Sequence, residues 1–267
     1  MESVEGNGRR ATDLERAIFT AQLTATEVLS ALSQTYHLEF TVPGLERFDF
    51  VPGQFISVVV DRVRTDGPRA GEVRQETRAY SLASAPGHSK GANRFDLCLN
   101  RVRSRTGSGF FSNLLCDLQV GDTIQFHGPH GDFTLRQPLA DSILIAADTG
   151  IAPIRGMMVG LFPKEGVDLS LGHQLALVHS ASREAELHYR GLFQQLSGGY
   201  RNIQYHSVIE EDAAQPGLLA QITRVLRAQP SIQTAYVCGL NAMVAPVRAH
   251  LKQLGWDRKQ IVFERYD

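Results

Sequence analysis

The spacing of apolar residues changes near Pro138, and this change constrains the fold more than any other feature of the chain. From Gln22 to about Pro138, short alternating stretches are separated by Gly and Pro, which is typical of antiparallel strands in a barrel or sandwich. After Pro138, buried-type strands alternate with segments of helical periodicity, which predicts a parallel sheet with helices on both faces. We therefore predict an antiparallel β-barrel domain over residues 1–138, with 1–20 as a frayed N-terminal extension, and a doubly wound α/β domain over residues 139–267.

The composition excludes several classes of function. The 267 residues carry a net charge of -1, so neither nucleic acid nor an anionic membrane is an expected partner. Cys98, Cys116 and Cys238 lie far apart and form no CxxC pair, which argues against an iron–sulfur or zinc site and against a disulfide framework. The acidic N-terminus lacks the features of a signal peptide, and no apolar run approaches the ~20 residues that span a bilayer. We expect a cytoplasmic protein without a metal site.

A cation, an aromatic ring and a hydroxyl stand together in the segment Arg78-Ala79-Tyr80-Ser81. On an extended strand, Arg78 and Tyr80 point to one side and Ser81 to the other, because successive side chains alternate. A flavin dinucleotide needs such a set: the guanidinium binds the pyrophosphate, the ring packs on the isoalloxazine, and the hydroxyl reaches the flavin edge. The alternative is a β-strand that ends at the turn at Pro86 and has Arg at its surface.

Two glycine-bearing turns are candidate phosphate sites. Thr149, Gly150 and Pro153 follow a buried strand and open a helix, where the helix N-terminus favours negative charge. The loop over residues 104–112 is rich in Gly and Ser and precedes a short helical run, so its backbone N–H groups can form an anion nest. Each turn has an ordinary alternative, a simple βα turn for the first and a flexible hairpin loop for the second.

The order of these motifs resembles the ferredoxin–NADP reductase family over about residues 25–267. Five short signals carry the resemblance in sequence order: Pro52-Gly53-Gln54-Phe55; Arg78-x-Tyr80-Ser81; Gly109-x-x-Ser112 before Gly121-Asp122 and Gly128-Pro129-x-Gly131-x-Phe133; Thr149-Gly150-x-x-Pro153; and Cys238-Gly239 with Glu264-x-Tyr266. The resemblance implies an FAD-binding barrel followed by a pyridine-nucleotide domain. It also implies an enzyme of the ferredoxin/flavodoxin–NAD(P)+ reductase type, which passes electrons between NADPH and a separate one-electron carrier.

The resemblance further implies roles for individual residues. Ser81, Cys238, Glu264 and Tyr266 would form the catalytic set, in which Tyr266 covers the flavin until nicotinamide displaces it. The residues implied for FAD are Arg78, Tyr80, Ser81, Leu99, Asn100, Gly109, Phe110, Phe111, Ser112 and Tyr266. The residues implied for the nucleotide are Thr149, Gly150, Pro153, Ser182, Arg183, Arg190, Cys238, Gly239 and Met243. From the residues alone, Tyr266 can also be a loose terminal residue and Cys238 a small buried hydrophobe.

The choice between NADPH and NADH depends on the end of the second α/β strand. That strand ends in Ser182-Arg183 with no acidic residue before the Arg, and Arg190 lies about two turns along a helix expected over residues 184–197. A 2′-phosphate needs positive charge there, whereas a free 2′-hydroxyl needs an acid, so these residues favour NADPH. Glu184 and Glu186 argue for NADH, and surface ion pairing is the alternative use of both arginines.

The implied acceptor is a separate protein, ferredoxin or flavodoxin first and the electron carrier of an oxygenase system second. Because both carriers are acidic, we expect a basic docking face. Its candidate residues are Arg62, Arg64, Arg69, Arg74, Arg101, Arg103 and Arg105. Two other classes remain open: a flavin-bearing electron-transfer subunit without nucleotide turnover, suggested by the Asp148 carboxylate in the phosphate turn, and a nucleotide-sensing module without flavin.

Overall fold

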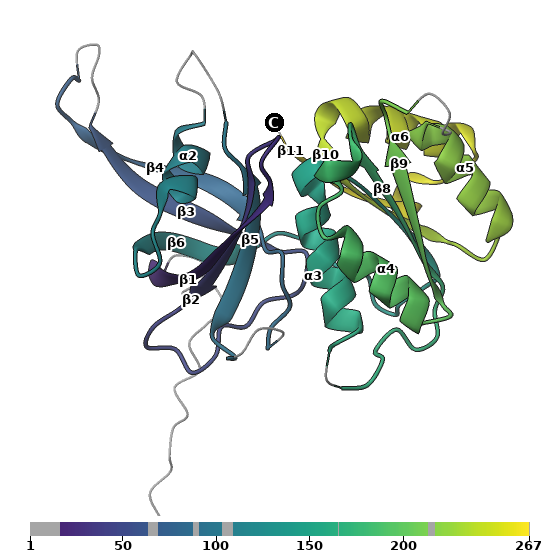
Figure 1. The fold of residues 1–267 in the computed structure, drawn as a ribbon, viewed down its shortest axis with the longest axis horizontal. Coiled ribbons are helices and arrows are strands. Elements are labelled where there is room, and N and C mark those ends of the chain that lie inside the picture. The colour runs from purple at the N-terminus through teal and green to yellow at the C-terminus, as the bar shows by residue number, and fades with distance from the viewer. Residues whose placement is uncertain are drawn as a thin grey trace, which may run out of the picture.

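A computed structural model describes residues 17–63, 69–87, 91–102, 109–164, 166–212 and 217–266. Figure 1 shows two lobes, a strand-rich one formed by the first part of the sequence and one with helices around a sheet formed by the second. This arrangement confirms the predicted two-domain fold. The boundary after residue 138 stays a prediction.

Six antiparallel strands form the first domain in the order β4-β3-β6-β1-β2-β5. A bridge between Leu82 and Leu97 joins the end of β4 to β5, and the amide of Ala83 donates to the carbonyl of Asp96 at 2.8 Å, so the sheet closes into the predicted barrel. The elements are β1 (Phe19–Ser30), β2 (Thr35–Thr41), β3 (Phe55–Val63), β4 (Val73–Ser81), β5 (Arg94–Asn100), α2 (Phe110–Asp117) and β6 (Thr123–His130).

Alternate residues of the barrel strands point inward and form its core. Leu38 and Phe40 on β2, Phe95 and Leu97 on β5, and Phe126 on β6 are at most 1% exposed. The rings of Phe40 and Phe95 stack with their centroids 5.3 Å apart. This period of two in burial is the physical origin of the alternation that predicts strands in the sequence.

Five parallel strands form the sheet of the second domain in the order β11-β10-β7-β8-β9. Because β7 is fully apolar over most of its length, both of its faces need cover, and helices supply it on each side. The strands are β7 (Ser142–Ala147), β8 (Leu175–Ala181), β9 (Ile203–Ile209), β10 (Thr234–Leu240) and β11 (Ile261–Tyr266). The helices are α3 (Ile151–Leu161), α4 (Arg190–Gly199), α5 (Leu218–Ala228) and α6 (Asn241–Gln253), with 3-10 turns η1 (Asp148–Gly150), η2 (Glu184–Glu186) and η3 (Arg258–Gln260).

Neighbouring residues of β7 belong to different hydrophobic cores. Leu144 packs with Ile154 of α3 and Phe193 of α4 on one face, whereas Ile143 packs with Ile222 of α5 and Val244 of α6 on the other. The helices therefore cover the two faces in pairs, as the alternation of strands and helices predicts. Among the described residues, no helix has both the length and the apolar character needed to cross a membrane.

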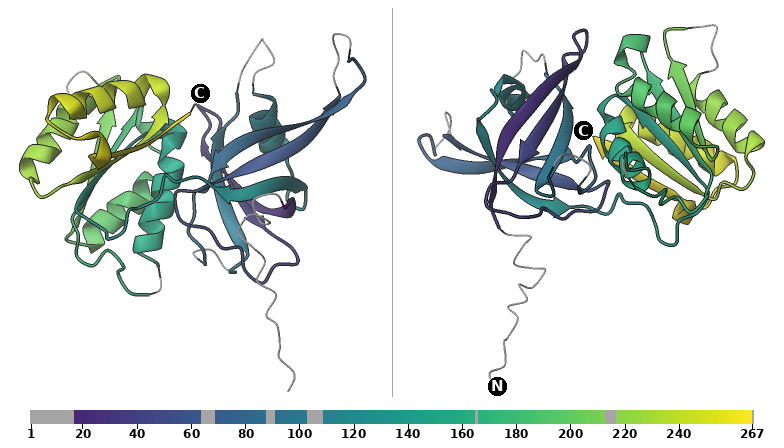
Figure 2. Two further views of the ribbon diagram at one scale, coloured as in Figure 1. Left: turned by 180° about the vertical axis from the view of Figure 1, so that it is seen from behind. Right: turned by 60° about the horizontal axis from the view of Figure 1, so that its bottom comes forward.

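A buried polar network joins the two domains. The Arg155 guanidinium on α3 lies 3.0 Å from the Asp96 carboxylate on β5 and also donates to the carbonyl of Ala83. Next to it, Nδ1 of His37 lies 2.9 Å from the hydroxyl of Tyr189. Figures 1 and 2 show that α3 is the helix of the second domain that lies toward barrel strand β5. The network thus fixes α3 against the barrel.

Gly156 allows α3 to approach the barrel closely. A Cβ atom at this position would lie 2.6 Å from the backbone oxygen of Ser84, a distance that real Cβ contacts do not show. By contrast, a Cβ atom at Gly191 on α4 would meet no atom within 4 Å. The contact between the domains therefore requires a glycine at position 156 of α3, whereas position 191 of α4 has room for a side chain.

We expect Gly156→Ala to lower the free energy of unfolding by about 1–3 kcal/mol, because the added methyl group must push α3 away from the segment after β4. The matched control Gly191→Ala should leave the free energy unchanged or raise it by up to about 1 kcal/mol, since the new side chain has room and the helix gains propensity. Urea denaturation of both variants checks this. Equal free energies for the two variants would contradict the close approach.

Three buried histidines make stability depend on pH. Burial lowers the pKa of His37 to about 4, with the Arg155 charge adding to the effect, and lowers the pKa of His188 to about 4 and of His179 to about 3. The unfolded chain titrates near pH 6.5, so it binds more protons than the folded protein below that pH. The free energy of unfolding should therefore fall as the pH drops from 6.5 to about 4, by up to about 1.4 kcal/mol per pH unit for each histidine. Denaturation at a series of pH values checks this, and a constant free energy between pH 6.5 and 5 would contradict it.

Candidate active site

Three strands bring four side chains together where the domains meet: Ser81, Cys238, Glu264 and Tyr266, which we call the Ser81 cluster. Oγ of Ser81 donates to Oε1 of Glu264 at 2.7 Å and accepts from the Tyr266 hydroxyl at 2.8 Å. Cys238 on β10 is the register partner of Glu264 on β11. The four residues predicted as the catalytic set are therefore neighbours, although the hydrogen bonds of Ser81 span 183 and 185 sequence positions.

Burial keeps the proton donors of the Ser81 cluster neutral. Burial raises the pKa of Cys238 and of Tyr266 well above their usual values, and the negative charge of Glu264 adds to both shifts. Burial also raises the pKa of Glu264, while the hydrogen bond from Ser81 opposes that shift. At neutral pH Cys238 is a thiol and Tyr266 a phenol, so the cluster presents S–H and O–H groups rather than a thiolate nucleophile.

The other face of β4 carries Arg78, which is exposed, and Tyr80, which is half-buried. The Tyr80 hydroxyl lies 3.0 Å from Oγ of Ser112, which joins β4 to the first turn of α2. Gly109 precedes α2 with a φ of 93°, in the left-handed region, and among the described residues no side chain caps the helix N-terminus. The ring of Tyr80 therefore lies beside an uncapped helix N-terminus, on the strand face that also presents a guanidinium.

The remaining residues implied for FAD surround this face. Leu99 is 3% exposed within the barrel core, so a ligand would meet its backbone, and Oδ1 of Asn100 accepts from the Thr35 hydroxyl at 2.6 Å. The exposed ring of Phe110 lies 4.4 Å from the Arg62 guanidinium, whereas Phe111 packs partly against the core. Residues 104–108 of the predicted anion loop lie outside the described residues.

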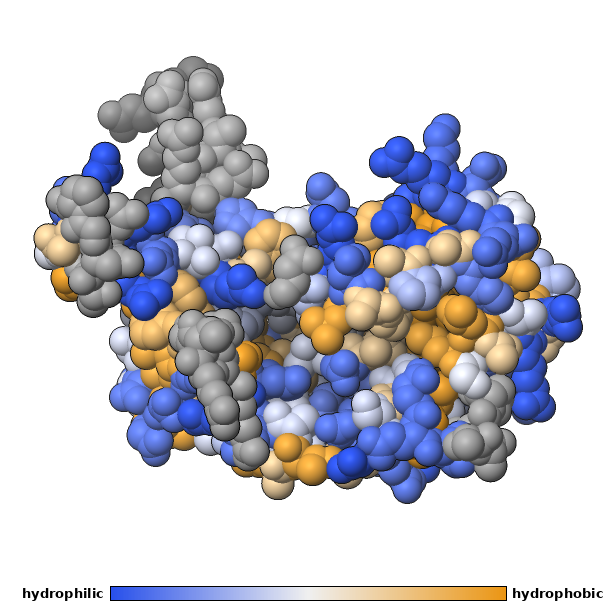
Figure 3. All heavy atoms as spheres, turned by 90° about the horizontal axis from the view of Figure 1, so that it is seen from above, coloured by the Kyte–Doolittle hydropathy of each residue, from blue (hydrophilic) through white to orange (hydrophobic). Residues whose placement is uncertain are grey.

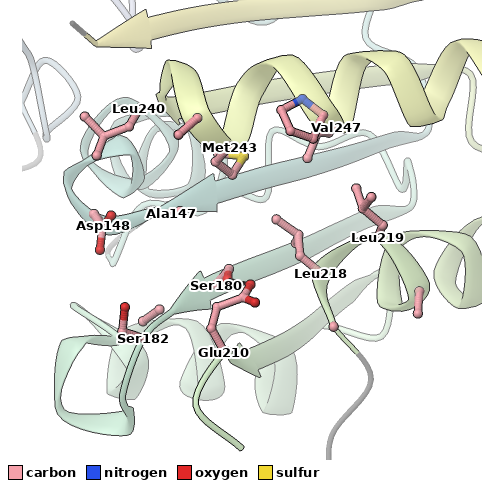
Figure 4. A pocket seen from close by; sticks show the side chains of 15 residues that line it. Ala147, Asp148, Ser180, Ser182, Glu210, Leu218, Leu219, Leu240, Met243 and Val247 are labelled. Atoms are coloured by element: carbon pink, nitrogen blue, oxygen red, sulfur yellow. Dashed lines mark hydrogen bonds between the residues drawn. The ribbon is translucent and has the colours of Figure 1, made fainter. Parts of the chain in front are cut away.

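A cavity of about 580 Å³ opens at the carboxyl edge of the parallel sheet, next to the point where the strand order reverses between β7 and β10. Its lining comes from the ends of β7, β8 and β10, from Glu210 directly after β9, and from α5 and α6. Figure 3 looks onto this edge and shows apolar surface on the second domain, bordered by hydrophilic residues. Figure 4 shows the side chains of Asp148, Ser182, Glu210 and Met243 around the cavity.

Close backbone packing positions the turn after β7. A Cβ atom at Gly150 would lie 2.3 Å from the carbonyl oxygen of Cys238, and one at Gly239 would lie 2.7 Å from Cε of Met243. Thr149 is half-buried, and Pro153 is buried in α3. Asp148 adopts a φ of 50°, and burial together with the Glu186 charge raises the pKa of its carboxyl. The predicted phosphate turn thus lies between the cavity and the Ser81 cluster.

The helix expected over residues 184–197 is wrong in its first half. Arg183 and Arg190, which were predicted to bind a 2′-phosphate, therefore do not share a helix face. After the short turn η2, Tyr189 takes a left-handed φ of 59°, and α4 begins only at Arg190. Nε of Arg183 lies 2.7 Å from Glu211, and Arg190 pairs with Glu184. Neither arginine lines the cavity, whereas Ser182 and Met243 do.

Sequence reasoning missed two groups of residues. Ser180, Glu210, Leu218 and Pro246 line the cavity. Glu210 directly follows β9, and the rule that parallel strands end at one common edge could have identified it. The network of Arg155, Asp96, His37 and Tyr189 left no signal, because its members come from four separate elements or loops.

Both surfaces have the chemistry that a dinucleotide requires. At β4, a guanidinium and an uncapped helix N-terminus suit a pyrophosphate, and a half-buried phenol ring suits a flat aromatic system. At β7, a tight glycine turn opens a helix beside an apolar cavity of dinucleotide-binding size. No group of three or more potential metal-ligating His, Cys, Asp or Glu side chains occurs within the described ranges.

Family models match both domains. The oxidoreductase FAD-binding domain matches residues 20–135, and the oxidoreductase NAD-binding domain matches residues 144–249. The chain is 30% identical over 264 residues to ferredoxin–NADP reductase B of Sorangium cellulosum, covering 93% of this chain and 98% of that protein. It is 26% identical to the 2-halobenzoate 1,2-dioxygenase electron transfer component of Burkholderia cepacia, covering 96% of this chain and 70% of that protein.

Solved structures share the fold at lower sequence identity. The ferredoxin–NADP+ reductase of Plasmodium falciparum superposes with a TM-score of 0.72 at 20% identity, covering 93% of this chain and 96% of that one. The cytochrome b5 reductase domain of Ulva prolifera nitrate reductase gives a TM-score of 0.74 at 19% identity, covering 94% and 98%. The matched domains, the two-domain fold and the full-length relative together establish that this chain belongs to the ferredoxin–NADP reductase family of FAD- and NAD(P)-dependent oxidoreductases.

Proposed function

We propose that this protein is a reductase that takes electrons from a reduced nicotinamide nucleotide and delivers them to a separate one-electron carrier protein, such as ferredoxin or flavodoxin. The observation that carries the proposal is the pair of hydrogen bonds by which Ser81 of the barrel donates to Glu264 and accepts from Tyr266 of the last strand. A reaction between a cofactor bound by the barrel and a nucleotide bound by the parallel sheet needs side chains that hold the two domains in register at their boundary. The full-length relative named ferredoxin–NADP reductase B supports the same activity.

Residues on β4 and α2 would hold FAD. The Arg78 guanidinium and the uncapped N-terminus of α2 bind the pyrophosphate, and the ring of Tyr80 packs on the flavin. The hydrogen bond between Tyr80 and Ser112 fixes the angle of that ring. When bound, FAD supplies the exchange between hydride transfer and one-electron transfer that the protein itself cannot perform.

The Ser81 cluster would position the reacting groups. Glu264 and Tyr266 hold the Ser81 hydroxyl in one orientation, so that it can form a hydrogen bond at the reacting edge of the flavin. Tyr266 covers the site and moves aside when nicotinamide enters, which also limits access of water. Cys238 is buried and neutral, so it contacts nicotinamide as a small thiol.

The acceptor would dock on the basic side of the barrel. Arg69 and Arg74 are exposed there, while Arg62 pairs with Glu76 at 3.0 Å and Arg101 with Asp117 at 2.5 Å. Arg64, Arg103 and Arg105 of the predicted docking face lie outside the described residues. Surface ion pairs are weak, so an acidic partner can compete for all of these cations. The free cysteines Cys98, Cys116 and Cys238 support a reducing compartment, and we propose the cytoplasm.

Two observations favour second candidates. The Burkholderia relative is named as an electron transfer component of a dioxygenase, which favours an oxygenase as the final consumer of electrons. The Asp148 carboxylate in the cavity opposes a nucleotide pyrophosphate, which favours a flavin-bearing subunit that does not turn over nucleotide.

The purified protein should be yellow, and its flavin absorbance should bleach when one equivalent of reduced nicotinamide nucleotide is added without oxygen. An anaerobic visible spectrum with NADPH and NADH in parallel cuvettes checks this. Adding oxidised ferredoxin should restore the absorbance, faster at low than at high ionic strength because docking is electrostatic. A flavin that neither nucleotide bleaches would support the subunit candidate, and a colourless protein would contradict both.

We expect Ser81→Ala to slow anaerobic flavin reduction by about tenfold or more while FAD stays bound, because the variant loses a positioned hydrogen bond at the reacting edge. The control Ser57→Ala removes a half-buried hydroxyl from the adjacent strand β3 and should leave the rate unchanged. Stopped-flow absorbance measures the rate, and the ratio of flavin to protein measures retention. Loss of FAD from Ser81→Ala would instead give Ser81 a structural role.

A further inference from the structure

The charged side chains around the cavity at the sheet edge are acidic. Asp148 at the end of β7 and Glu210 at the end of β9 line it, together with the hydroxyls of Ser180 and Ser182. Among the described lining residues, none is Lys, Arg or His. The positive features nearby are the N-termini of α5 at Gly217 and of α6 at Asn241, and their partial charges of about half a unit each are together smaller than the charge of the two carboxylates.

A buried serine holds Glu210 in place. Ser180 is 2% exposed, and its hydroxyl donates to Oε1 of Glu210 at 2.7 Å. That bond fixes the carboxylate toward the cavity, as Figure 4 shows, and leaves Oε2 able to accept a hydrogen bond from a ligand. Glu210 is exposed to solvent, but the buried Ser180 hydroxyl holds one of its carboxylate oxygens in place.

The nearby arginines form surface ion pairs with carboxylates. Arg183 is paired with Glu211, and the charge of Glu186 also acts on it, while Arg190 is paired with Glu184. A phosphate that recruited either guanidinium would have to displace a carboxylate of the protein. Both pairs are exposed and therefore weak, so they reduce the attraction of these arginines for a 2′-phosphate without abolishing it.

Sheet topology determines which part of a dinucleotide meets Glu210. The Ser81 cluster lies at β10 and β11, and the glycine turn for the pyrophosphate follows β7. In the order β11-β10-β7-β8-β9, a nicotinamide near the cluster and a pyrophosphate at β7 leave the adenosine half over the ends of β8 and β9. There Leu218 of α5 offers an apolar contact for a base, and the Glu210 carboxylate lines the cavity where the ribose would lie.

We propose that this pocket selects a nucleotide whose adenosine ribose has a free 2′-hydroxyl, so that NADH rather than NADPH is the donor, and that Glu210 determines the selection. The inference rests on the proposed function. A free 2′-hydroxyl donates a hydrogen bond to the Glu210 carboxylate, whereas a 2′-phosphate brings up to two negative charges against Glu210 and Asp148.

The test measures binding to the FAD-loaded protein with ADP-ribose and 2′-phospho-ADP-ribose. These probes lack nicotinamide, so they need not displace Tyr266 from the reacting site. By calorimetry at low ionic strength, ADP-ribose should bind at least about tenfold more tightly than its 2′-phosphorylated form. Equal or tighter binding of the phosphorylated probe, or no binding of either probe, would overturn the proposal.

Two glutamine variants distinguish an effect of Glu210 itself from the effect of removing any one negative charge from the protein. Glu210→Gln should weaken ADP-ribose and strengthen the phosphorylated probe, reducing the ratio of affinities to about threefold or less, because the variant removes both the acceptor charge and the repulsion. The matched control Glu46→Gln removes one exposed carboxylate from the first domain and should keep the ratio within about twofold. An unchanged ratio in Glu210→Gln would overturn the assignment to this residue.

Flavin reduction distinguishes this proposal from the proposed function. Selective binding of ADP-ribose without bleaching by NADH or NADPH would support the selection and contradict the reductase activity. Bleaching that is faster with NADPH, together with tighter binding of the phosphorylated probe, would support the activity and overturn the selection. Bleaching that is faster with NADH, with the ratio reduced in Glu210→Gln, supports both.

Discussion

The buried ion pair between Arg155 and Asp96 is the contact on which the arrangement of the two domains depends. The Asp96 side chain is 3% exposed and the Arg155 side chain 12%, so water screens neither charge well. Each charge would be costly in the interface alone, and removing one partner would leave the other buried, at a cost of about 3–5 kcal/mol. Because Arg155 lies in the first turns of α3, the pair attaches the nucleotide-domain turn directly to a barrel strand.

Short contacts transmit this attachment to the reacting centre. The turn before α3 packs on the carbonyl of Cys238, and β10 pairs in register with β11, which carries Glu264 and Tyr266. Ser81 at the end of β4 then meets these two residues at hydrogen-bonding distance. A reaction between two bound cofactors is sensitive to small misplacements, so a rigid chain of contacts between the domains has a direct functional use.

The electrostatics of the molecule differ among its three regions. Burial keeps the thiol and phenol of the Ser81 cluster uncharged, which suits a dry centre for hydride transfer. The nucleotide cavity presents carboxylates, and the β3–β4 part of the barrel exposes arginines beside carboxylates such as Asp61 and Glu72. Under the proposed function and the proposed selection, these regions would bind a nicotinamide ring, a nucleotide with a free 2′-hydroxyl and an acidic protein, respectively.

The sequence by itself determined the two-domain fold, because apolar periodicity and glycine turns are local properties of the chain. It also predicted Ser81, Cys238, Glu264 and Tyr266 as one set, because short motifs in a fixed order carry the family resemblance, and the structure places these four residues together. Only the tertiary structure decided that Arg155 pairs with Asp96, that Glu184 and Glu211 pair with Arg190 and Arg183, and that Ser180 holds Glu210 at the cavity. These outcomes depend on which side chains come into contact between loops and strands that are far apart in the sequence. Neither the spacing of residues nor the composition determines those contacts.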